Sequence, residues 1–382
     1  MKKRIVCIAA GVWLAAAVFS APQVRAEPMS APSVSASAAV LIHADTGSVL
    51  FEKDAESERP MASTTKIMTA LLTLEAAEKD DRVVTITEEM VRVEGSSMGL
   101  KAGYSLPLSG LAKGMLLASG NDAANAAAIA VGGDVETFVG QMNARAKEIG
   151  MAQTCFVTPS GLDAEGHVST ALDMARLGAC ALQNEGFAAI VRERQLPVAF
   201  VNPELTTYYS NHNKLLRLYE GCIGIKTGFT KKAGRCLVSA AERDGVRLVA
   251  VTLNAPDDWN DHIRMFDYGF SLFSEQTLPG ASFDADVVGG TAETVRLSSA
   301  AVRVPLTAEE AAAVETEIEC PPFLYAPVSH GEQAGVVRYR IGDTVVAESP
   351  LTVSGHVGYA VPPEKTLWEK LWGAVTGFFK GG

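Results

Sequence analysis

Two hairpin signals bracket a long helical stretch, and this arrangement constrains the fold more than any other feature of the chain. Near the N-terminus, two short apolar runs flank Asp45-Thr46-Gly47. Much further along, the runs 236–241 and 246–253 flank Asp244-Gly245, a strong turn signal. Strands at both ends with helices between them predict an α/β (α+β) domain in which one antiparallel sheet is flanked by helices.

Helical spacing of apolar residues fills the stretch between the hairpins, and it recurs after them. Thr170 and Asp173 have capping-box spacing and predict a helix that begins there. The expected helices cover 63–79, 111–131, 135–149, 170–182 and 259–270.

The chain changes character after about residue 276. Short apolar strands separated by Gly-rich turns predict a second, small all-β domain over 276–361. It has no cluster of His, Cys or carboxylate residues, so the chemistry is expected in the main domain, over 38–275.

The first 26 residues have the composition of a secretory signal. Lys2, Lys3 and Arg4 precede an apolar run over 5–19, and Val24-Arg25-Ala26 fits a small-x-small cleavage site. The run is short for a membrane-spanning helix, which needs about 20 residues. We therefore expect a signal peptide over 1–26, export, and a linker over 27–37 that is rich in Ser, Ala and Pro.

Residues 362–382 form a distinct tail. After Pro362-Pro363, an aromatic and aliphatic stripe follows helical spacing: Leu367, Trp368, Leu371, Trp372, Val375, Phe378 and Phe379. A short helix of this kind is typical of an amphipathic segment that lies in the headgroup region of a membrane. Packing of the helix on a protein neighbour is the alternative.

Charge and cysteine usage exclude several classes of function. The net charge is -11, and loss of the signal with Lys2, Lys3, Arg4 and Arg25 would change it to -15. Without clustered Lys and Arg, nucleic-acid binding is not expected. The six cysteines are scattered without a C-x-x-C, and there is no H-E-x-x-H. We therefore expect no disulfide framework, no metal site and no cofactor.

Ser63-Thr64-Thr65-Lys66 is the one S-x-x-K of the chain. Residues three apart share a helix face, so the Ser63 hydroxyl and the Lys66 amine are neighbours. A neutral amine can activate a serine, and burial or a second cation lowers the pKa of a lysine. By itself the motif also fits a serine N-cap followed by a surface lysine.

Two further motifs favour the catalytic interpretation of the S-x-x-K over the N-cap interpretation. Ser119-Gly120-Asn121 and Lys226-Thr227-Gly228 follow the S-x-x-K in that order. Each alone fits a turn, but the ordered set is typical of penicillin-binding proteins and class A β-lactamases.

With these motifs, the chain resembles the low-molecular-weight penicillin-binding proteins that act as serine-type D-alanyl-D-alanine carboxypeptidases. The resemblance covers about residues 36–275, and the β-rich domain and the tail match the family plan more weakly. Further segments that carry it are Pro60-Met61-Ala62, Gly95-Ser96-Ser97, Gly161-Leu162-Asp163, His167-Val168-Ser169-Thr170, Asn211-His212-Asn213 and Phe229-Thr230.

The resemblance implies catalytic roles for three residues. Ser63 would be the nucleophile that forms the acyl-enzyme, and Lys66 would be the base for acylation. Ser119 would relay a proton to the leaving D-alanine. His167 is expected to lie beside a helix cap and to stay outside the catalytic set, because no G-x-S-x-G surrounds Ser63.

The resemblance also implies a substrate-binding set. Asn121 would bind the substrate backbone, and Lys226 and Thr227 would hold the terminal carboxylate next to Gly228. The backbone N–H groups of Ser63 and Phe229 would form the oxyanion hole. A cation beside a hydroxyl suits recognition of a carboxylate.

The partners that the resemblance implies are peptidoglycan pentapeptide stems as substrates and β-lactam antibiotics as covalent inhibitors. The expected location is the outer face of the cytoplasmic membrane, where the tail would attach the enzyme peripherally to the membrane surface.

Two other functions remain open from the sequence. A serine β-lactamase needs a glutamate that activates water, and the nearest candidate, Glu193, is followed by Pro197 where an Asn would be expected. A non-catalytic β-lactam or cell-wall sensor would keep the same pocket without turnover.

Overall fold

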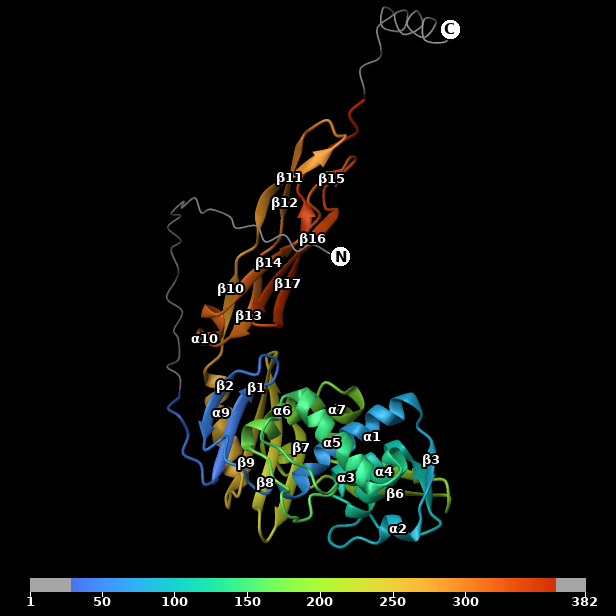
Figure 1. The fold of residues 1–382 in the computed structure, drawn as a ribbon. Coiled ribbons are helices and arrows are strands. Elements are labelled where there is room, and N and C mark those ends of the chain that lie inside the picture. Colours follow the sequence, from blue (N-terminus) through green and yellow to red (C-terminus); the bar gives the residue numbers. More distant parts are fainter. Residues whose placement is uncertain (1–28, 362–382) are drawn as a thin grey trace, which may run out of the picture. The chain divides into compact units, whose positions relative to one another are not determined.

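The computed structural model describes residues 29–361 (Figure 1). The expected signal peptide and the expected C-terminal helix lie outside these residues. The described chain divides into two compact units. One contains the residues up to Ser274 together with Pro305–Glu310, and the other contains Glu275–Val304 and the residues from Ala311 on.

The first unit combines helices with one large sheet and two small ones. Its elements are β1 (Ala38–His43), β2 (Val49–Lys53), the 3-10 turn η1 (Ala62–Thr65), α1 (Lys66–Lys79), β3 (Val83–Thr85), α2 (Glu88–Val91), β4 (Ser105–Pro107), α3 (Leu108–Leu117), α4 (Asn121–Gly132), α5 (Val135–Ile149), α6 (Ala171–Ala181), α7 (Glu185–Val191), β5 (Gln195–Phe200), β6 (Leu205–Ser210), α8 (Leu215–Leu218), β7 (Cys222–Thr230), β8 (Gly234–Arg243), β9 (Val246–Leu253) and α9 (Asp258–Ser271).

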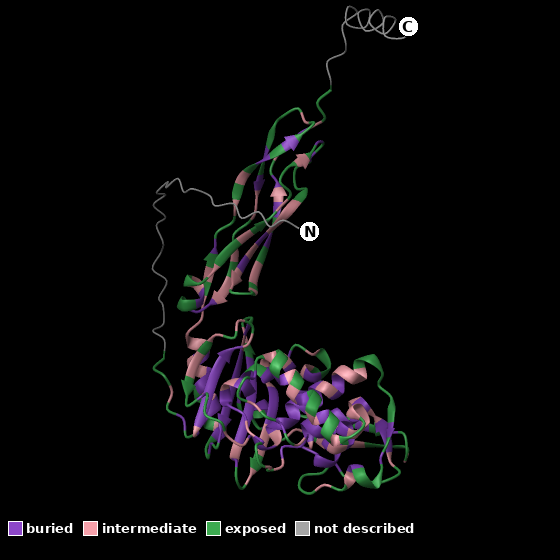
Figure 2. Cartoon of the chain, in the orientation of Figure 1, coloured by how far each residue is buried: buried purple, intermediate pink, exposed green. Residues whose placement is uncertain are grey.

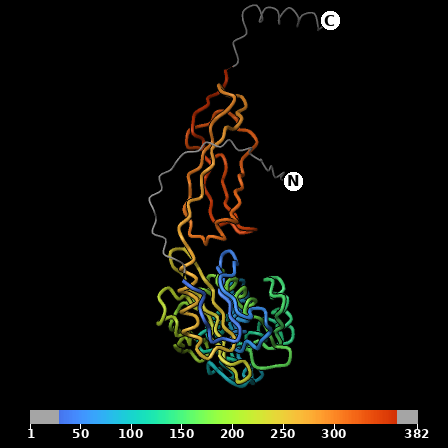
Figure 3. Tube along the Cα trace, turned by 90° about the vertical axis from the view of Figure 1, so that its left-hand side faces the viewer, coloured from blue at the N-terminus to red at the C-terminus, as the bar shows by residue number. Residues whose placement is uncertain are grey.

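The large sheet joins the two ends of this unit. Its order is β2-β1-β9-β8-β7, and all neighbours run antiparallel. Val40 of β1 lies opposite Val251 of β9, so segments far apart in sequence are side by side (Figure 3). This arrangement confirms the predicted antiparallel sheet.

Helices cover both faces of the sheet because its central strands are apolar on both sides. Along β1, Val40 and Ile42 pack into the core shared with α1, α3, α4 and α6, whereas Leu41 packs against Phe266 of α9. Successive strand side chains point to opposite faces. Figure 2 shows the resulting band of buried residues along the sheet.

Two of the expected helical regions are not continuous α-helices, and both departures lie in the motifs Ser63-Thr64-Thr65-Lys66 and Ser119-Gly120-Asn121. The helical region expected over 111–131 consists of α3 and α4, which are separated at Ser119, a residue with a left-handed φ of 58°. The helix expected from residue 63 opens with the turn η1, and α1 begins only at Lys66. The turn Asp244-Gly245 forms as predicted, with positive φ at both residues as a tight two-residue hairpin requires.

The expected cap at Thr170 is present. Its side chain accepts a hydrogen bond from the backbone N–H of Asp173 at 3.1 Å, and α6 begins at the next residue. A satisfied N-cap explains why the helix starts there.

The second unit is built on a six-stranded sheet, as the sequence predicts for an all-β domain. The strand order is β14-β16-β17-β12-β11-β15, and within this sheet the β11–β15 pair is parallel while the other neighbours run antiparallel. Tyr339 is fully buried, and its hydroxyl donates to the carbonyl oxygen of Pro279 at 2.6 Å. The elements from Ser274 on are β10 (Ser274–Leu278), β11 (Ser282–Val288), β12 (Thr294–Ser298), β13 (Val302–Leu306), α10 (Ala308–Ala312), β14 (Glu315–Glu319), β15 (Leu324–Tyr325), β16 (Gln333–Ile341) and β17 (Thr344–Val353).

No helix among residues 29–361 has the length and apolar character needed to cross a membrane.

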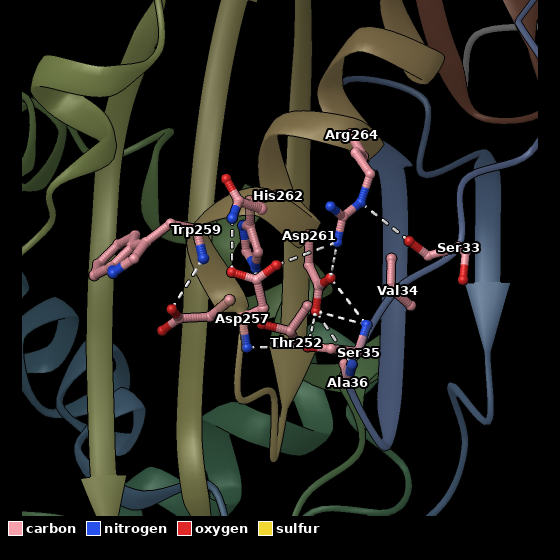
Figure 4. A network of polar contacts seen from close by, with 12 residues as sticks. Ser33, Val34, Ser35, Ala36, Thr252, Asp257, Trp259, Asp261, His262 and Arg264 are labelled. Carbon is pink, nitrogen blue, oxygen red and sulfur yellow. Dashed lines mark hydrogen bonds and ion pairs between the residues drawn. The ribbon is translucent and has the colours of Figure 1, made fainter.

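The described part of the segment before β1, which was expected as a linker over 27–37, is hydrogen-bonded to α9. Val34 and Ala36 are buried, and the carboxylate of Asp261 accepts hydrogen bonds from the backbone N–H of Ser35 at 2.9 Å and of Ala36 at 3.1 Å (Figure 4). The hydroxyl of Ser35 also donates to Asp261, at 2.7 Å. The Arg264 guanidinium donates to the same carboxylate at 2.6 Å. Because Asp261 is fully buried, these donors together compensate its lost hydration.

Asp261→Asn should lower the free energy of unfolding by about 1–3 kcal/mol, because an amide N–H₂ would face the backbone donors of Ser35 and Ala36. Urea unfolding followed by far-UV circular dichroism measures the loss. Asp257→Asn is the matched control, since Asp257 is the N-cap residue of the same helix and its side chain is 49% exposed. Equal stability of the two variants would show that the segment is not held by Asp261.

Candidate active site

The first motif lies where η1 passes into α1. The Nζ atom of Lys66 is 2.9 Å from the Oγ atom of Ser63, as the spacing of the two residues predicts. Lys66 is fully buried, whereas Ser63 is partly exposed. The hydroxyl is therefore open to a ligand while the amine behind it is shielded from water.

Three oxygen atoms surround the Lys66 amine. Besides Ser63 Oγ, they are Oδ1 of Asn121 at 2.6 Å and the carbonyl oxygen of Ser160 at 2.6 Å. Burial lowers the pKa of Lys66 well below its usual value of 10.5, and the charge of Lys226 lowers it further, while Asp122 raises it. A neutral amine in this position can accept a proton.

The other two motifs meet beside this pair. Lys226 Nζ donates to Ser119 Oγ at 3.0 Å and to the carbonyl oxygen of Thr227 at 2.8 Å. Burial lowers the pKa of Lys226 from 10.5 to about 7. Ser119 is only 5% exposed, and the break between α3 and α4 turns its hydroxyl toward this lysine.

Strand β7 runs directly past the serine. A Cβ atom on Gly228 would lie 3.0 Å from the backbone nitrogen of Ser63 and 3.1 Å from that of Thr64, so only glycine fits without a shift. β7 is the last strand of its sheet, which leaves one edge without a strand partner among the described residues. Phe229 on this strand is 66% exposed.

Asn121 has both polar atoms of its side chain engaged. Oδ1 accepts from Lys66, and Nδ2 donates to the carbonyl oxygen of Glu94 at 2.6 Å. The structure therefore makes Asn121 an orienting partner of Lys66, in addition to the substrate contact that the resemblance implies for it.

Two residues of the site have no role in the sequence-based prediction. The carbonyl oxygen of Ser160 carries no side-chain signal, although Gly161 beside it belongs to one of the segments that carry the resemblance. Asp122 accepts hydrogen bonds from three successive backbone N–H groups, Met98 to Leu100, at 2.9–3.1 Å. An acidic residue in the first turn of a helix is the one clue the sequence offers for it.

The side chains that commonly bind metals are not clustered in the described part of the chain. Among residues 29–361, no group of three or more His, Cys, Asp or Glu side chains is arranged to hold a metal ion.

A serine beside a buried lysine, with a second buried lysine on an edge strand, is typical of serine hydrolases in which a lysine replaces the usual histidine base. The sequence matches the D-alanyl-D-alanine carboxypeptidase family over residues 25–257 and the C-terminal domain of penicillin-binding protein 5 over 279–359.

Individual relatives agree with this class. The chain is 33% identical to the D-alanyl-D-alanine carboxypeptidase DacF of Bacillus subtilis, over 83% of this chain and 84% of that protein. It is 33% identical to DacC of Escherichia coli, over 87% and 86%. Among solved structures, penicillin-binding protein 5 of Haemophilus influenzae superimposes with a TM-score of 0.62 at 27% identity, covering 86% of this chain and 99% of the other.

The chain belongs to the D-alanyl-D-alanine carboxypeptidase family. It is a low-molecular-weight penicillin-binding protein with serine-type carboxypeptidase activity.

Proposed function

We propose that this enzyme removes the terminal D-alanine from peptidoglycan pentapeptide stems through an acyl-enzyme on Ser63. The observation that carries the proposal is the 2.9 Å contact between Ser63 Oγ and the buried amine of Lys66, with Lys226 beside it. β-Lactams would acylate the same serine.

The hydrogen bonds of Lys66 support its role as the base. Asn121 Oδ1 and the Ser160 carbonyl can only accept, so they take two N–H groups of the amine. A neutral amine has two N–H groups and one lone pair, and the position left for the lone pair faces Ser63 Oγ. Lys66 can then take the serine proton as the oxygen attacks.

The environment of Lys226 supports its role in binding the terminal carboxylate of the substrate. Its ammonium is buried, and its hydrogen bonds within residues 29–361 go to the Ser119 hydroxyl and to the Thr227 carbonyl oxygen, both of which are uncharged. An incoming carboxylate would stabilise the charged form of Lys226 and add charge-assisted hydrogen bonds. Thr227 and Gly228 follow it on the edge strand, next to the exposed Phe229.

The reaction then has two chemical steps. The Ser63 oxygen attacks the carbonyl carbon of the penultimate residue, and the backbone N–H groups of Ser63 and Phe229 stabilise the oxyanion. The C–N bond to the terminal D-alanine breaks as a proton reaches its nitrogen by way of Ser119. Water then hydrolyses the ester and restores the serine.

The location follows from segments outside residues 29–361. The composition of residues 1–26 supports export, and the stripe from Leu367 to Phe379 supports attachment of residues 362–382 to the membrane surface. We propose that the enzyme works on the outer face of the cytoplasmic membrane, where the pentapeptide substrate is accessible.

Ser63→Ala should abolish both D-alanine release from a pentapeptide and covalent labelling by fluorescent penicillin, because only the attacking oxygen is lost.

Lys66→Arg should slow labelling by about a hundredfold or more, since a guanidinium stays protonated and cannot act as a base.

The same assays separate the other functions. Fast turnover of nitrocefin with little D-alanine release would indicate a β-lactamase, and labelling without any D-alanine release would indicate a sensor. Labelling that survives Ser63→Ala would overturn the choice of nucleophile.

The pH profile of kcat/KM should be bell-shaped. The neutral form of Lys66 is the active one, so activity rises as pH increases through its lowered pKa. The charged form of Lys226 binds the carboxylate, so activity falls as pH rises through a pKa of about 7 in the free enzyme. In Lys226→Arg the alkaline limb should disappear, because arginine stays charged. An unchanged alkaline limb in that variant would assign it to another group.

Truncation at Pro362 should release a soluble enzyme that is labelled by penicillin as fast as the full chain. Burial of each large apolar side chain of the stripe is worth at most about 1.5–3 kcal/mol, and an interface buries it only partly. Co-sedimentation of both forms with lipid vesicles measures the difference. Equal sedimentation would favour a helix that packs on protein.

A further inference from the structure

The proposed mechanism leaves one buried titratable side chain near the nucleophile without a role. His167 is 4% exposed and lies against the turn η1. Its Nδ1 accepts a hydrogen bond from the backbone N–H of Val157 at 2.9 Å, and its Nε2 is 2.9 Å from Oγ1 of Thr65. Burial lowers the pKa of His167 to about 4, so the imidazole is neutral at physiological pH.

The backbone N–H of Val157 determines which atom donates and which accepts in each of these hydrogen bonds. A backbone N–H can only donate, so Nδ1 of His167 is the acceptor and the single proton of the ring is on Nε2. Nε2 therefore donates to Thr65. The Thr65 hydroxyl uses its own proton to donate to the carbonyl oxygen of Ala62 at 2.9 Å.

This chain of hydrogen bonds ends on the residue directly before the nucleophile. Ala62 has a φ of 50°, a left-handed conformation that residues with a side chain rarely adopt. A Cβ atom on Gly161 would lie 1.9 Å from the same carbonyl oxygen, which shows how closely the loop around 157–161 packs on Ala62. The direction of the Ala62 carbonyl determines how the following peptide presents Ser63.

The loop held by His167 also supplies the partner of the base. The carbonyl oxygen of Ser160 accepts from Lys66 Nζ at 2.6 Å, three residues after Val157. One imidazole therefore connects the peptide that presents the nucleophile with the carbonyl that orients the lysine.

We propose that His167 and Thr65 are positioning residues for acylation. They hold the Ser63 hydroxyl and the Lys66 amine in contact through three hydrogen bonds, from Val157 N–H to His167, from His167 to the Thr65 hydroxyl, and from that hydroxyl to the Ala62 carbonyl oxygen. Neither residue touches the substrate in this scheme. The inference rests on the proposed role of Ser63 and Lys66, and it adds the device that keeps their 2.9 Å contact.

Substitutions at Thr65 separate the hydrogen bonds of its hydroxyl from the packing of its branched side chain. Thr65→Val keeps the branched shape and removes the hydroxyl, whereas Thr65→Ser keeps the hydroxyl. Thr73→Val is the matched control, because Thr73 is also fully buried on α1 and donates to the Thr69 carbonyl at 2.6 Å, away from the serine.

Substitutions at His167 test the two ring nitrogens. His167→Gln keeps an N–H donor near the position of Nε2, whereas His167→Asn keeps an acceptor near Nδ1 and removes the donor to Thr65. The double variant Thr65→Val/His167→Asn tests whether the two residues act in one chain.

The measurement is the rate of covalent labelling of the full chain by a fluorescent penicillin at saturating concentration, with thermal unfolding of every variant. We expect Thr65→Val and His167→Asn each to slow labelling by about tenfold to a hundredfold. Thr65→Ser and Thr73→Val should stay within about threefold of the unmodified enzyme, and His167→Gln, which keeps the donor to Thr65, should be slowed less than His167→Asn. The double variant should be no slower than the slower single variant.

The outcomes separate this inference from the proposed function. If Thr65→Val and Thr73→Val lose stability alike and label equally fast, the positioning role is wrong while the role of Ser63 stands. If Thr65→Val fails to fold, the His167 variants decide: a His167→Asn variant that is labelled within about threefold of the unmodified enzyme would also reject the positioning role. An unmodified enzyme that penicillin does not label would instead overturn the proposed function.

Discussion

The burial of the Lys66 amine among three oxygen atoms is the interaction on which the site depends. An unpaired ammonium in the protein interior is costly, so it must lose its proton or be surrounded by acceptors. Here burial lowers the pKa of the Lys66 amine, and Asn121 and the Ser160 carbonyl accept hydrogen bonds from it. Each acceptor comes from a different part of the chain. The buried, hydrogen-bonded environment of the Lys66 amine therefore exists only when α1, α4 and the loop before α6 are packed together.

The second buried lysine extends the same principle to substrate recognition. Lys226 lies on an edge strand beside Ser119, and its burial lowers its pKa as well. Two buried lysines of like charge favour the neutral form of at least one of them. In the proposed mechanism Lys66, which lies against Ser63, is the neutral lysine, and Lys226 binds the negative charge of the substrate.

Much of the fold and of the site could be predicted because those features are local. The turn Asp244-Gly245, the Thr170 cap and the spacing of Ser63 and Lys66 each act within a few residues. The helical region over 111–131 forms as predicted, but the apolar periodicity on both sides of Ser119 did not show that its left-handed conformation divides the region into α3 and α4. The docking of Ser35 on Asp261 was not foreseen, since these residues are distant in sequence and the segment has a linker-like composition.

The sequence by itself determined the class of chemistry, because three short motifs in a set order supply a nucleophile, a base and a cation. Only the tertiary structure decided how they work together. The carbonyl of Ser160 and the contact of His167 with Thr65 have no signature in the side-chain pattern, since a backbone oxygen can belong to any residue and a buried histidine can have many partners. Their positions come from packing between segments far apart in the chain, and packing is the property that a local pattern of residues cannot specify.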